Sequence, residues 1–311
     1  MRKSKRVNIM ITNAKKLDLV AIYLFICDLY EKELKYVCQR FSNNCNPDFT
    51  DQEIITIYLF VMLTERKFEI KQIHKYTDEY LRSWFPLLPS YVAFNTRLNR
   101  LSEPFKILIE IILNNFVPSD CSKEISLLDS LPIITCSGKR KAKVAREITD
   151  KSYCSTKSMW YYGLKLHILA SRRPGTLPFP EQILFTPASE NDLNLYKQAW
   201  SEIQNRNFFG DKIYIDATFF DAVFKNFNSI MFTPVKEIKN QSDAIKKRDK
   251  AANDLFSKAV SKIRQPIESL FNWLITKTDI QRASRVRSTK GLMVHAFGRI
   301  AAAFIYLIFN S

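Results

Sequence analysis

The apolar residues in the first part of the chain recur every three or four positions, a period that predicts amphipathic helices. Thr50 followed by Glu53 forms the capping-box pattern that marks a helix start. Ser90 follows Pro89 where an N-cap residue is expected, and Pro86 ends the stretch before it. Four helical stretches are therefore predicted, over residues 17–41, 53–67, 70–85 and 90–116.

The pattern changes near residue 118, where a polar break precedes short apolar runs rich in β-branched and aromatic residues. Such runs are typical of strands, and three come in succession, over 125–135, 159–171 and 181–189. Helical and strand patterns then alternate: a helix over 190–207, a strand within 208–216, a helix over 216–227 and a strand over 229–235. We predict a mixed α/β sheet flanked by helices in residues 119–311, with a helical part at 244–311, after an all-helical region at 1–118.

Between the first two predicted strands lies a basic segment, residues 137–158, with few apolar side chains. This composition predicts a loop that phosphate contacts order, although a merely solvated loop has the same composition. Its clustered cations are Lys139, Arg140, Lys141, Lys143 and Arg146. The helix face that carries Arg97 and Arg100 is open to the same two interpretations, a recognition surface or a solvated face.

Lysine and arginine outnumber aspartate and glutamate by 47 to 31, which gives a net charge of +16. This balance favours a polyanionic partner such as DNA, RNA or an anionic membrane. The longest apolar run, 296–309, contains Arg299 and is shorter than the about 20 residues that span a bilayer, so we expect a buried terminal helix and no membrane partner. The basic opening segment lacks the apolar stretch of a secretory signal, which predicts a cytoplasmic protein. The cysteines form no CxxC pair, so structural zinc is not expected.

Three carboxylates stand in apolar surroundings: Asp129 within a predicted strand, Asp211 beside another, and Glu268 after Pro266 at the start of a predicted helix. A charge in such a setting is costly unless a cation or partner compensates it. Carboxylate oxygens are ligands that Mg²⁺ accepts, and two ions can activate the oxygens of a phosphodiester. Taken singly, the aspartate can cap a turn and the glutamate can pair with Arg264 one turn earlier. Together, in a basic chain, they favour phosphodiester chemistry on nucleic acid.

The second aspartate has a local alternative in Asp216. If the strand covers 212–216, Asp216 lies at its carboxyl end, where α/β sheets bind ligands. If the strand covers 207–211, Asp211 holds that position. The choice depends on where one short strand ends, which a sequence defines least well.

Several short motifs occur in an order that is informative as a set. They are Leu128-Asp129-Ser130 with Pro132, Tyr162-Gly163-Leu164-Lys165-Leu166-His167, Thr186-Pro187-Ala188 through Asn191-Asp192, Gly210-Asp211-Lys212-Ile213-Tyr214, Arg264-x-x-x-Glu268, and Arg287-Ser288-x-Lys290-Gly291 with His295 and Gly298-Arg299. Over residues 125–309 this set resembles the DDE transposases of bacterial insertion sequences, and most closely the insertion-sequence family numbered 982.

The resemblance implies an RNase H-like catalytic domain at 119–311 and a DNA-binding region at 1–118. It implies that Asp129, Asp211 and Glu268 ligate two Mg²⁺ or Mn²⁺ ions, and it favours Asp211 over Asp216. The implied reaction is metal-assisted attack of water at a transposon end, followed by attack of the freed 3′-hydroxyl on target DNA. The implied partners are transposon-end and target DNA, bound by a homodimer associated with the nucleoid.

Basic side chains near these motifs are candidates for holding the DNA backbone. Lys165 and His167 could contact phosphate or orient a ligand, and ordinary strand polarity is the alternative. The candidates are Lys139, Arg140, Lys141, Lys165, His167, Arg264, Arg285, Arg287 and Lys290, together with Arg299. Two other functions remain open: an RNase H-like nuclease that cuts without joining, and a decayed or repurposed transposase that binds DNA without catalysis.

Overall fold

The computed structural model describes residues 13–39, 47–236 and 243–309, so the basic opening segment at 1–12 lies outside the described residues. The chain divides into two compact units. The helical unit comprises residues 1–112, 274–280 and 286–311, and the sheet unit comprises residues 113–273 and 281–285. The first boundary lies close to the predicted one at 118. The helical part predicted at 244–311 is divided between the two units instead of belonging to the sheet unit alone.

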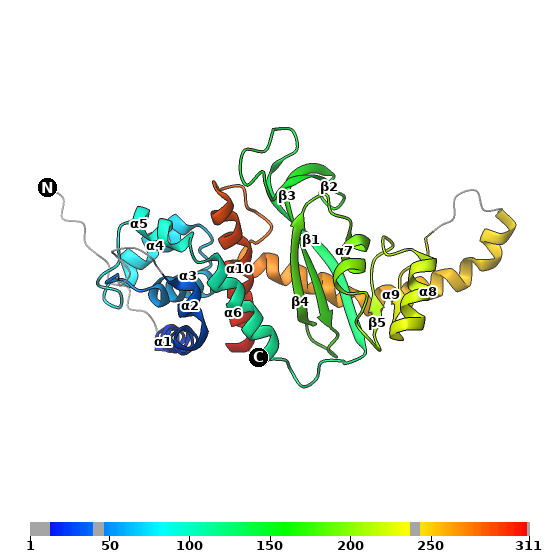
Figure 1. Cartoon of the computed structure of the whole chain (residues 1–311), viewed down its shortest axis with the longest axis horizontal. Coiled ribbons are helices and arrows are strands. Elements are labelled where there is room, and N and C mark those ends of the chain that lie inside the picture. The colour runs from blue at the N-terminus through cyan, green and yellow to red at the C-terminus, as the bar shows by residue number, and fades with distance from the viewer. Residues whose placement is uncertain (1–12, 40–46, 237–242, 310–311) are drawn as a thin grey trace. The chain divides into compact units, whose positions relative to one another are not determined.

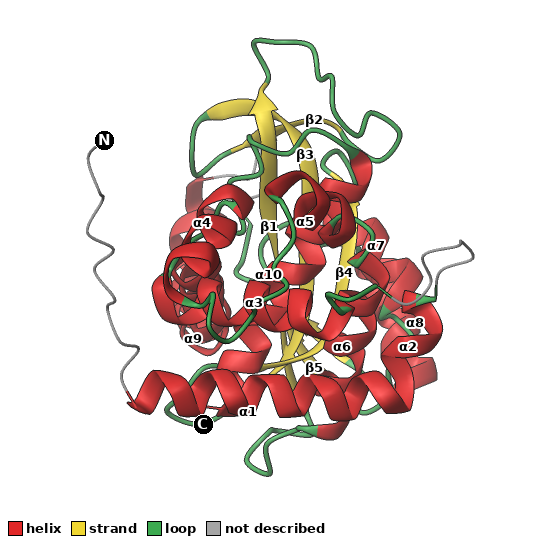
Figure 2. Ribbon diagram, turned by 90° about the vertical axis from the view of Figure 1, so that its left-hand side faces the viewer, coloured by secondary structure: helices red, strands yellow, loops and turns green. Residues whose placement is uncertain are grey.

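The helices of the first part largely follow the predicted pattern (Figures 1 and 2). The capping box is present: the Glu53 amide donates to the Thr50 hydroxyl at 3.3 Å, and the Thr50 amide donates to the Glu53 carboxylate at 2.6 Å. Ser90 caps its helix as predicted, but the stretch 90–116 forms two helices. Arg97 pairs with the buried Asp51 at 2.9 Å, which removes it from the exposed surface considered above. The elements are α1 (Asn13–Leu29), the π-helical turn η1 (Tyr30–Leu34), α2 (Lys35–Cys38), α3 (Asp51–Glu65), α4 (Ile70–Tyr80), α5 (Tyr91–Leu98) and α6 (Ser102–Asn115).

The last helix, α10 (Thr289–Phe309), is 21 residues long and apolar enough to cross a membrane, so the sequence argument from its length was wrong. Its most apolar window is 67% buried, as in a core helix. Arg299 is buried in this helix, and it donates to the Phe68 carbonyl at 2.6 Å and to the Thr278 carbonyl. These bonds offset the cost of burying the guanidinium. The predicted contact between Arg299 and DNA is therefore wrong.

Six strands form one mixed sheet in the sheet unit. They are β1 (Ile125–Ser137), β2 (Asp150–Cys154), β3 (Met159–Ser171), β4 (Phe179–Pro187), β5 (Asn207–Phe209) and β6 (Ile230–Phe232). The order is β2-β3-β1-β5-β6, and β4 also pairs with β3. β3 pairs antiparallel with β1 and β4, whereas β5 runs parallel to β1 and β6. The predicted fold class, a mixed α/β sheet flanked by helices with a helical region before it, is confirmed.

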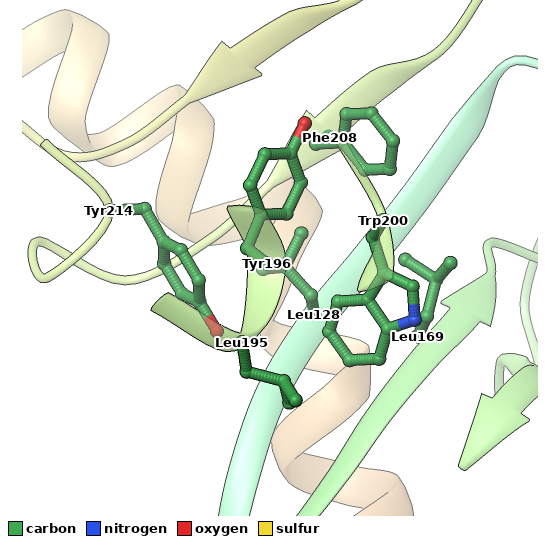
Figure 3. Close-up of a cluster of buried hydrophobic side chains, with 7 residues drawn as sticks. All are labelled: Leu128, Leu169, Leu195, Tyr196, Trp200, Phe208 and Tyr214. Carbon is green, nitrogen blue, oxygen red and sulfur yellow. The ribbon is translucent and has the colours of Figure 1, made fainter. Parts of the chain in front are cut away.

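Successive side chains of β1 point to opposite faces of the sheet. Leu128 lies in a buried apolar cluster that includes Trp200 and residues of the helix α7 (Asp192–Ala199; Figure 3). The next residue, Asp129, points to the other face, which the helix α9 (Asp243–Thr278) crosses (Figure 1). The helices that follow the sheet strands are α7 (Asp192–Ala199), α8 (Ala217–Phe227) and α9 (Asp243–Thr278).

Two local predictions for this part of the chain were wrong. β2 lies inside the segment 137–158 that was predicted as a loop, because five largely polar residues give no apolar signal and their strand depends on pairing with β3. Pro266 lies inside α9 instead of at its start. A proline inside a helix leaves the carbonyl four residues earlier unbonded. Here that residue is the exposed Lys262, whose carbonyl water can satisfy.

One ionic cluster joins several strands of the sheet. Glu181 of β4 accepts two hydrogen bonds from Arg206, at 2.9 and 3.0 Å, just before β5 begins. The same carboxylate accepts from Ser171 of β3 at 2.6 Å and from Ser126 of β1 at 3.2 Å. Arg206 is therefore the cation that allows this carboxylate to sit between three strands.

Replacing Arg206 by methionine should lower the free energy of unfolding by about 2–4 kcal/mol, because Glu181 would stay partly buried without its cation. Arg173→Met is the matched control: Arg173 makes one 2.8 Å bond to Asp120, a more exposed carboxylate, and should cost less than about 1 kcal/mol. Urea unfolding of both variants measures the difference. Equal losses would contradict a special role for the Glu181 cluster.

Candidate active site

Asp129 is a largely buried carboxylate in β1, with 23% of its side chain exposed. Its Oδ1 accepts from the Ser130 amide at 2.8 Å, and its Oδ2 accepts from Arg264 Nη1 at 2.8 Å. Burial raises the pKa of Asp129 from 3.8 to about 6, against the lowering effects of Arg264 and the Ser130 amide. Asp129 therefore releases its proton less readily than an exposed aspartate, and a greater positive charge beside it would stabilise its ionised form.

Arg264 joins two of the predicted site residues. Its second terminal nitrogen, Nη2, donates to Glu268 one turn later in α9, so one guanidinium holds both Asp129 and Glu268. The glutamate is half exposed, whereas its neighbours Ile267 and Leu270 are buried. The pairing of Glu268 with Arg264, considered as a structural alternative, is thus present, and it brings two carboxylates to one cation.

Asp211 follows β5 at the position beside Asp129. The parallel pairing of β1 with β5 ends at Leu127 and Phe209, and two residues farther along each chain stand Asp129 and Asp211. Neighbouring strands lie about 4.8 Å apart, so the two aspartates start from adjacent backbone positions. The charges of Asp192 and, to a smaller extent, Asp211 also raise the pKa of Asp129. Asp211 is exposed, and its Oδ1 accepts from the Lys212 amide at 2.7 Å.

The alternative aspartate, Asp216, has a different environment. It is the N-cap of α8, where its Oδ1 accepts from the Phe219 amide at 3.1 Å. Lys197 of α7 donates to its Oδ2 at 2.6 Å, and this bond lowers the pKa of Asp216. The strand ends at Phe209, which is the frame that leaves Asp211 beside β5 and makes Asp216 a capping residue.

A second polar cluster lies on the opposite face of the sheet. Asp192, the first residue of α7, accepts from Ser130 at 2.9 Å and from Lys165 at 2.9 Å. His167 Nδ1 lies 3.7 Å from the same carboxylate, and its Nε2 is 2.8 Å from the Thr186 hydroxyl. Burial lowers the pKa of His167 to about 4, so this imidazole is neutral at pH 7.

These contacts change the roles predicted for two basic residues. His167 is fully buried, so it has no surface with which to contact a DNA phosphate, and that prediction was wrong. Lys165 is 16% exposed and also donates to the Glu190 carbonyl at 2.7 Å, so its ammonium is held inside the protein. Lys165 instead pairs with Asp192, and the neutral His167 lies beside the same carboxylate without a hydrogen bond to it.

Sequence reasoning missed Asp192 as the partner of Lys165 on the opposite face of the sheet. Two signals pointed to it: Asn191 is a good N-cap residue directly before it, and Lys165 and His167 share one strand face that needs a counter-charge. The pairing of strands that brings these residues to α7 is not visible in the sequence.

The remaining predicted DNA contacts fall in separate parts of the chain. Lys139, Arg140 and Lys141 are exposed in the segment between β1 and β2. Arg285 is exposed in the sheet unit, and Arg287 and Lys290 are exposed in the helical unit. Their side chains are thus accessible to a polyanion.

The carboxylates have the donor chemistry of a hard-cation site, but the described residues form no ready metal centre. Within the described ranges no group of three histidine, cysteine, aspartate or glutamate side chains is arranged to hold an ion. The guanidinium of Arg264 takes the place of a cation between Asp129 and Glu268. Tyr214 Oη and Arg264 Nε are buried without a hydrogen-bond partner in the described part of the chain. The Tyr214 hydroxyl, on which the charges of Asp129 and Asp211 act, and the oxygens of these carboxylates are groups that a hydrated ion could bond.

Comparison with known proteins identifies the sheet unit. A family model described as a transposase DDE domain matches residues 119–289, more than half of the chain. The matched segment contains Asp129, Asp211 and Glu268. No curated protein matches the chain closely enough to count as a relative.

The raised pKa of Asp129 predicts a specific dependence of stability on pH. Because the pKa is raised from 3.8 to about 6, the stabilising contribution is fully present below pH 4 and is lost as the pH rises through 6. Relative to Asp129→Asn, the free energy of unfolding of the unaltered protein should fall by roughly 2 kcal/mol across this interval. In Arg264→Ala this loss of stability should extend to higher pH, because Arg264 lowers the pKa of Asp129 in the folded protein.

Urea unfolding at a series of pH values measures this contribution. Parallel stability curves for the unaltered protein and Asp129→Asn between pH 4 and 6 would contradict the prediction.

Proposed function

The chain belongs to the family of transposases with a DDE domain, and from this membership we propose that it cleaves DNA at the ends of a mobile element and joins the freed strand to target DNA. The observation that carries the proposal is that one guanidinium holds both Asp129 and Glu268, with Asp211 two residues past the end of the pairing between β5 and β1. A cation-seeking site in a strongly basic chain suits phosphodiester chemistry.

In this proposal Asp129, Asp211 and Glu268 hold Mg²⁺ or Mn²⁺, two ions of which would activate the attacking oxygen and stabilise the leaving oxygen of a phosphodiester. The chain's own contribution is to position these groups on a paired strand, a strand end and a helix. Arg264, once it no longer pairs with the carboxylates, can donate two parallel hydrogen bonds to a phosphate of the DNA.

A transposase implies DNA as a partner, and the charge distribution supports this. The exposed cations Lys139, Arg140 and Lys141 can neutralise backbone phosphates, as can Arg285, Arg287 and Lys290. A homodimer on DNA and a cytoplasmic, nucleoid-associated location complete the proposal.

One observation favours a second candidate, a DNA-binding protein without catalysis. Arg264 already compensates both Asp129 and Glu268, and a permanently held pair would leave no room for an ion. This candidate predicts DNA binding that does not depend on any of the three carboxylates. A nuclease that cuts without joining would keep the three carboxylates, and a strand-transfer assay separates it from a transposase.

The carboxylates are tested by nicking of a duplex that carries the inverted repeats flanking the gene, in the presence of Mg²⁺ or Mn²⁺. Asp129→Asn, Asp211→Asn and Glu268→Gln should each reduce nicking by at least roughly a hundredfold, because each removes a metal ligand and several kcal/mol of transition-state stabilisation. Asp216→Asn is the matched control and should reduce nicking by less than about threefold, since its carboxylate caps α8.

The assignment fails if Asp216→Asn abolishes nicking while Asp211→Asn leaves it intact. If the unaltered protein shows no metal-dependent nicking and all variants still bind DNA, the non-catalytic candidate is favoured.

The affinity for DNA should fall steeply with salt, because each neutralised phosphate releases condensed counterions. If six or more phosphates are neutralised, the dissociation constant of the element-end duplex should rise about a thousandfold between 50 and 200 mM salt. Fluorescence anisotropy at several salt concentrations measures the slope. An affinity that does not change over this range would contradict the predicted phosphate contacts.

A further inference from the structure

An exposed aromatic pair occupies the outer face of the β2–β3 hairpin. Tyr153 and Trp160 are direct cross-strand partners, and their ring centroids lie 5.5 Å apart at an interplanar angle of 62°. Tyr153 is 51% exposed and Trp160 is 55% exposed. Cross-strand aromatic pairs stabilise hairpins by less than about 1 kcal/mol. This small stabilisation does not by itself explain why two aromatic rings are more than half exposed to water.

The backbone around Trp160 is firmly held. The Gly138 amide donates to the Trp160 carbonyl at 2.7 Å, and a Cβ on Gly138 would lie only 2.5 Å from the Trp160 Cβ. The next residue, Tyr161, is buried on the other face of the hairpin. Trp160 is therefore mounted on rigid backbone with one side of its ring system toward solvent, as a preformed binding surface requires.

Positive charge surrounds the aromatic pair. Lys151 Nζ lies 5.3 Å from the centroid of the Trp160 ring. Residues 137–158 contain seven lysines and arginines against two acidic residues, a net charge of +5. The lysines and arginines of this segment are all exposed: Lys139, Arg140, Lys141, Lys143, Arg146, Lys151 and Lys157. Part of the segment projects as a loop beyond the ends of β1 and β3 (Figures 1 and 2).

Flat aromatic faces beside many cations have the chemistry of a surface for single-stranded nucleic acid. Bases stack on the rings, the cations neutralise the backbone, and little sequence preference results. A duplex hides the faces of its bases in its own stack, so the aromatic pair can use only an unpaired nucleotide. The charge also argues against an apolar protein partner, because seven cations would be desolvated on docking.

We propose that Tyr153 and Trp160 form a stacking site for an unpaired DNA nucleotide, with the basic segment 137–158 holding the adjoining phosphates. The proposal rests on the proposed function for its source of ligand, since cleavage at a DNA end frees a single strand. Trp160 stands eight residues along β3 from Ile168, the partner of Asp129, which is roughly 26 Å of extended strand. The stacking site therefore binds DNA away from the reacting phosphodiester and takes no part in the chemical step.

The test uses the full chain without metal ions, in EDTA, and two fluorescent probes: single-stranded oligothymidylate of twelve or so nucleotides and a duplex of the same length. Trp160→Ala should weaken binding of the single strand by about tenfold or more, and Trp160→Phe should retain most of the affinity. Both variants should change the affinity for the duplex by less than about twofold, because phosphate contacts dominate there.

Two controls separate stacking from other effects. Phe224→Ala removes another exposed aromatic ring, one that lies on α8 outside the basic segment, and should leave the single-strand affinity unchanged. Lys157→Gln should weaken single strand and duplex alike, since it removes charge and no aromatic surface. The single strand should also quench tryptophan emission in the unaltered protein, and less so in Trp160→Phe.

The proposal is overturned if Trp160→Ala changes single-strand affinity by less than twofold, or weakens duplex and single strand equally. Tighter binding of the matching RNA oligonucleotide would overturn the assignment to DNA. Duplex nicking is measured separately. If nicking depends on the carboxylates while Trp160→Ala binds the single strand normally, only the stacking site fails. If Trp160-dependent binding is present without metal-dependent nicking, only the proposed function fails.

Discussion

The structure of the site depends on the cost of placing Asp129, a negative charge, inside a paired strand. Burial raises the pKa of this carboxyl to about 6, and only the Ser130 amide and the Arg264 guanidinium act against that cost. Because Arg264 lies on α9, the ion pair also fixes the turn of α9 that carries Glu268. Arg264 pairs with two carboxylates, Asp129 and Glu268, and Asp211 adds a third negative charge that acts on Asp129. Such an excess of negative charge favours a divalent ion over a single guanidinium, whose place between the carboxylates marks where positive charge is needed.

Successive side chains of β1 point to opposite faces of the sheet, so the negative charge around Asp129 is separated from a second polar cluster, in which the charges balance. Ser130 points to the face of α7, where Lys165 compensates Asp192 and the buried His167 is neutral. Within this cluster the charges of Lys165 and Asp192 cancel, so its polar groups can hold α7 in place without attracting an ion. The two clusters are adjacent in sequence but differ in charge, and this difference supports the assignment of chemistry to the face of α9.

Local features could be predicted from the sequence, and features that depend on distant pairing could not. The capping box at Thr50 and the strand β1 are encoded by residues close together in the sequence, and both are present as expected. The end of β5 depends on pairing with β1, so the sequence alone left Asp211 and Asp216 as alternatives. Asp192 was missed because its bond with Lys165 joins α7 to β3, and the sequence does not show which strand lies beside α7. The buried bonds of Arg299 likewise join carbonyls far apart in the chain.

The strand β3 connects the two surfaces proposed to act on DNA. It pairs with β1 along most of its length and with β2 and β4 on its other edge, so its backbone positions cannot move independently. A nucleotide stacked on Trp160 would therefore be held in a fixed relation to Asp129. At roughly 26 Å of strand between them, such a contact cannot alter the charge or the pKa of the carboxylate. It can act only by restricting where the bound strand lies, which lowers the entropic cost of bringing one phosphodiester to the site.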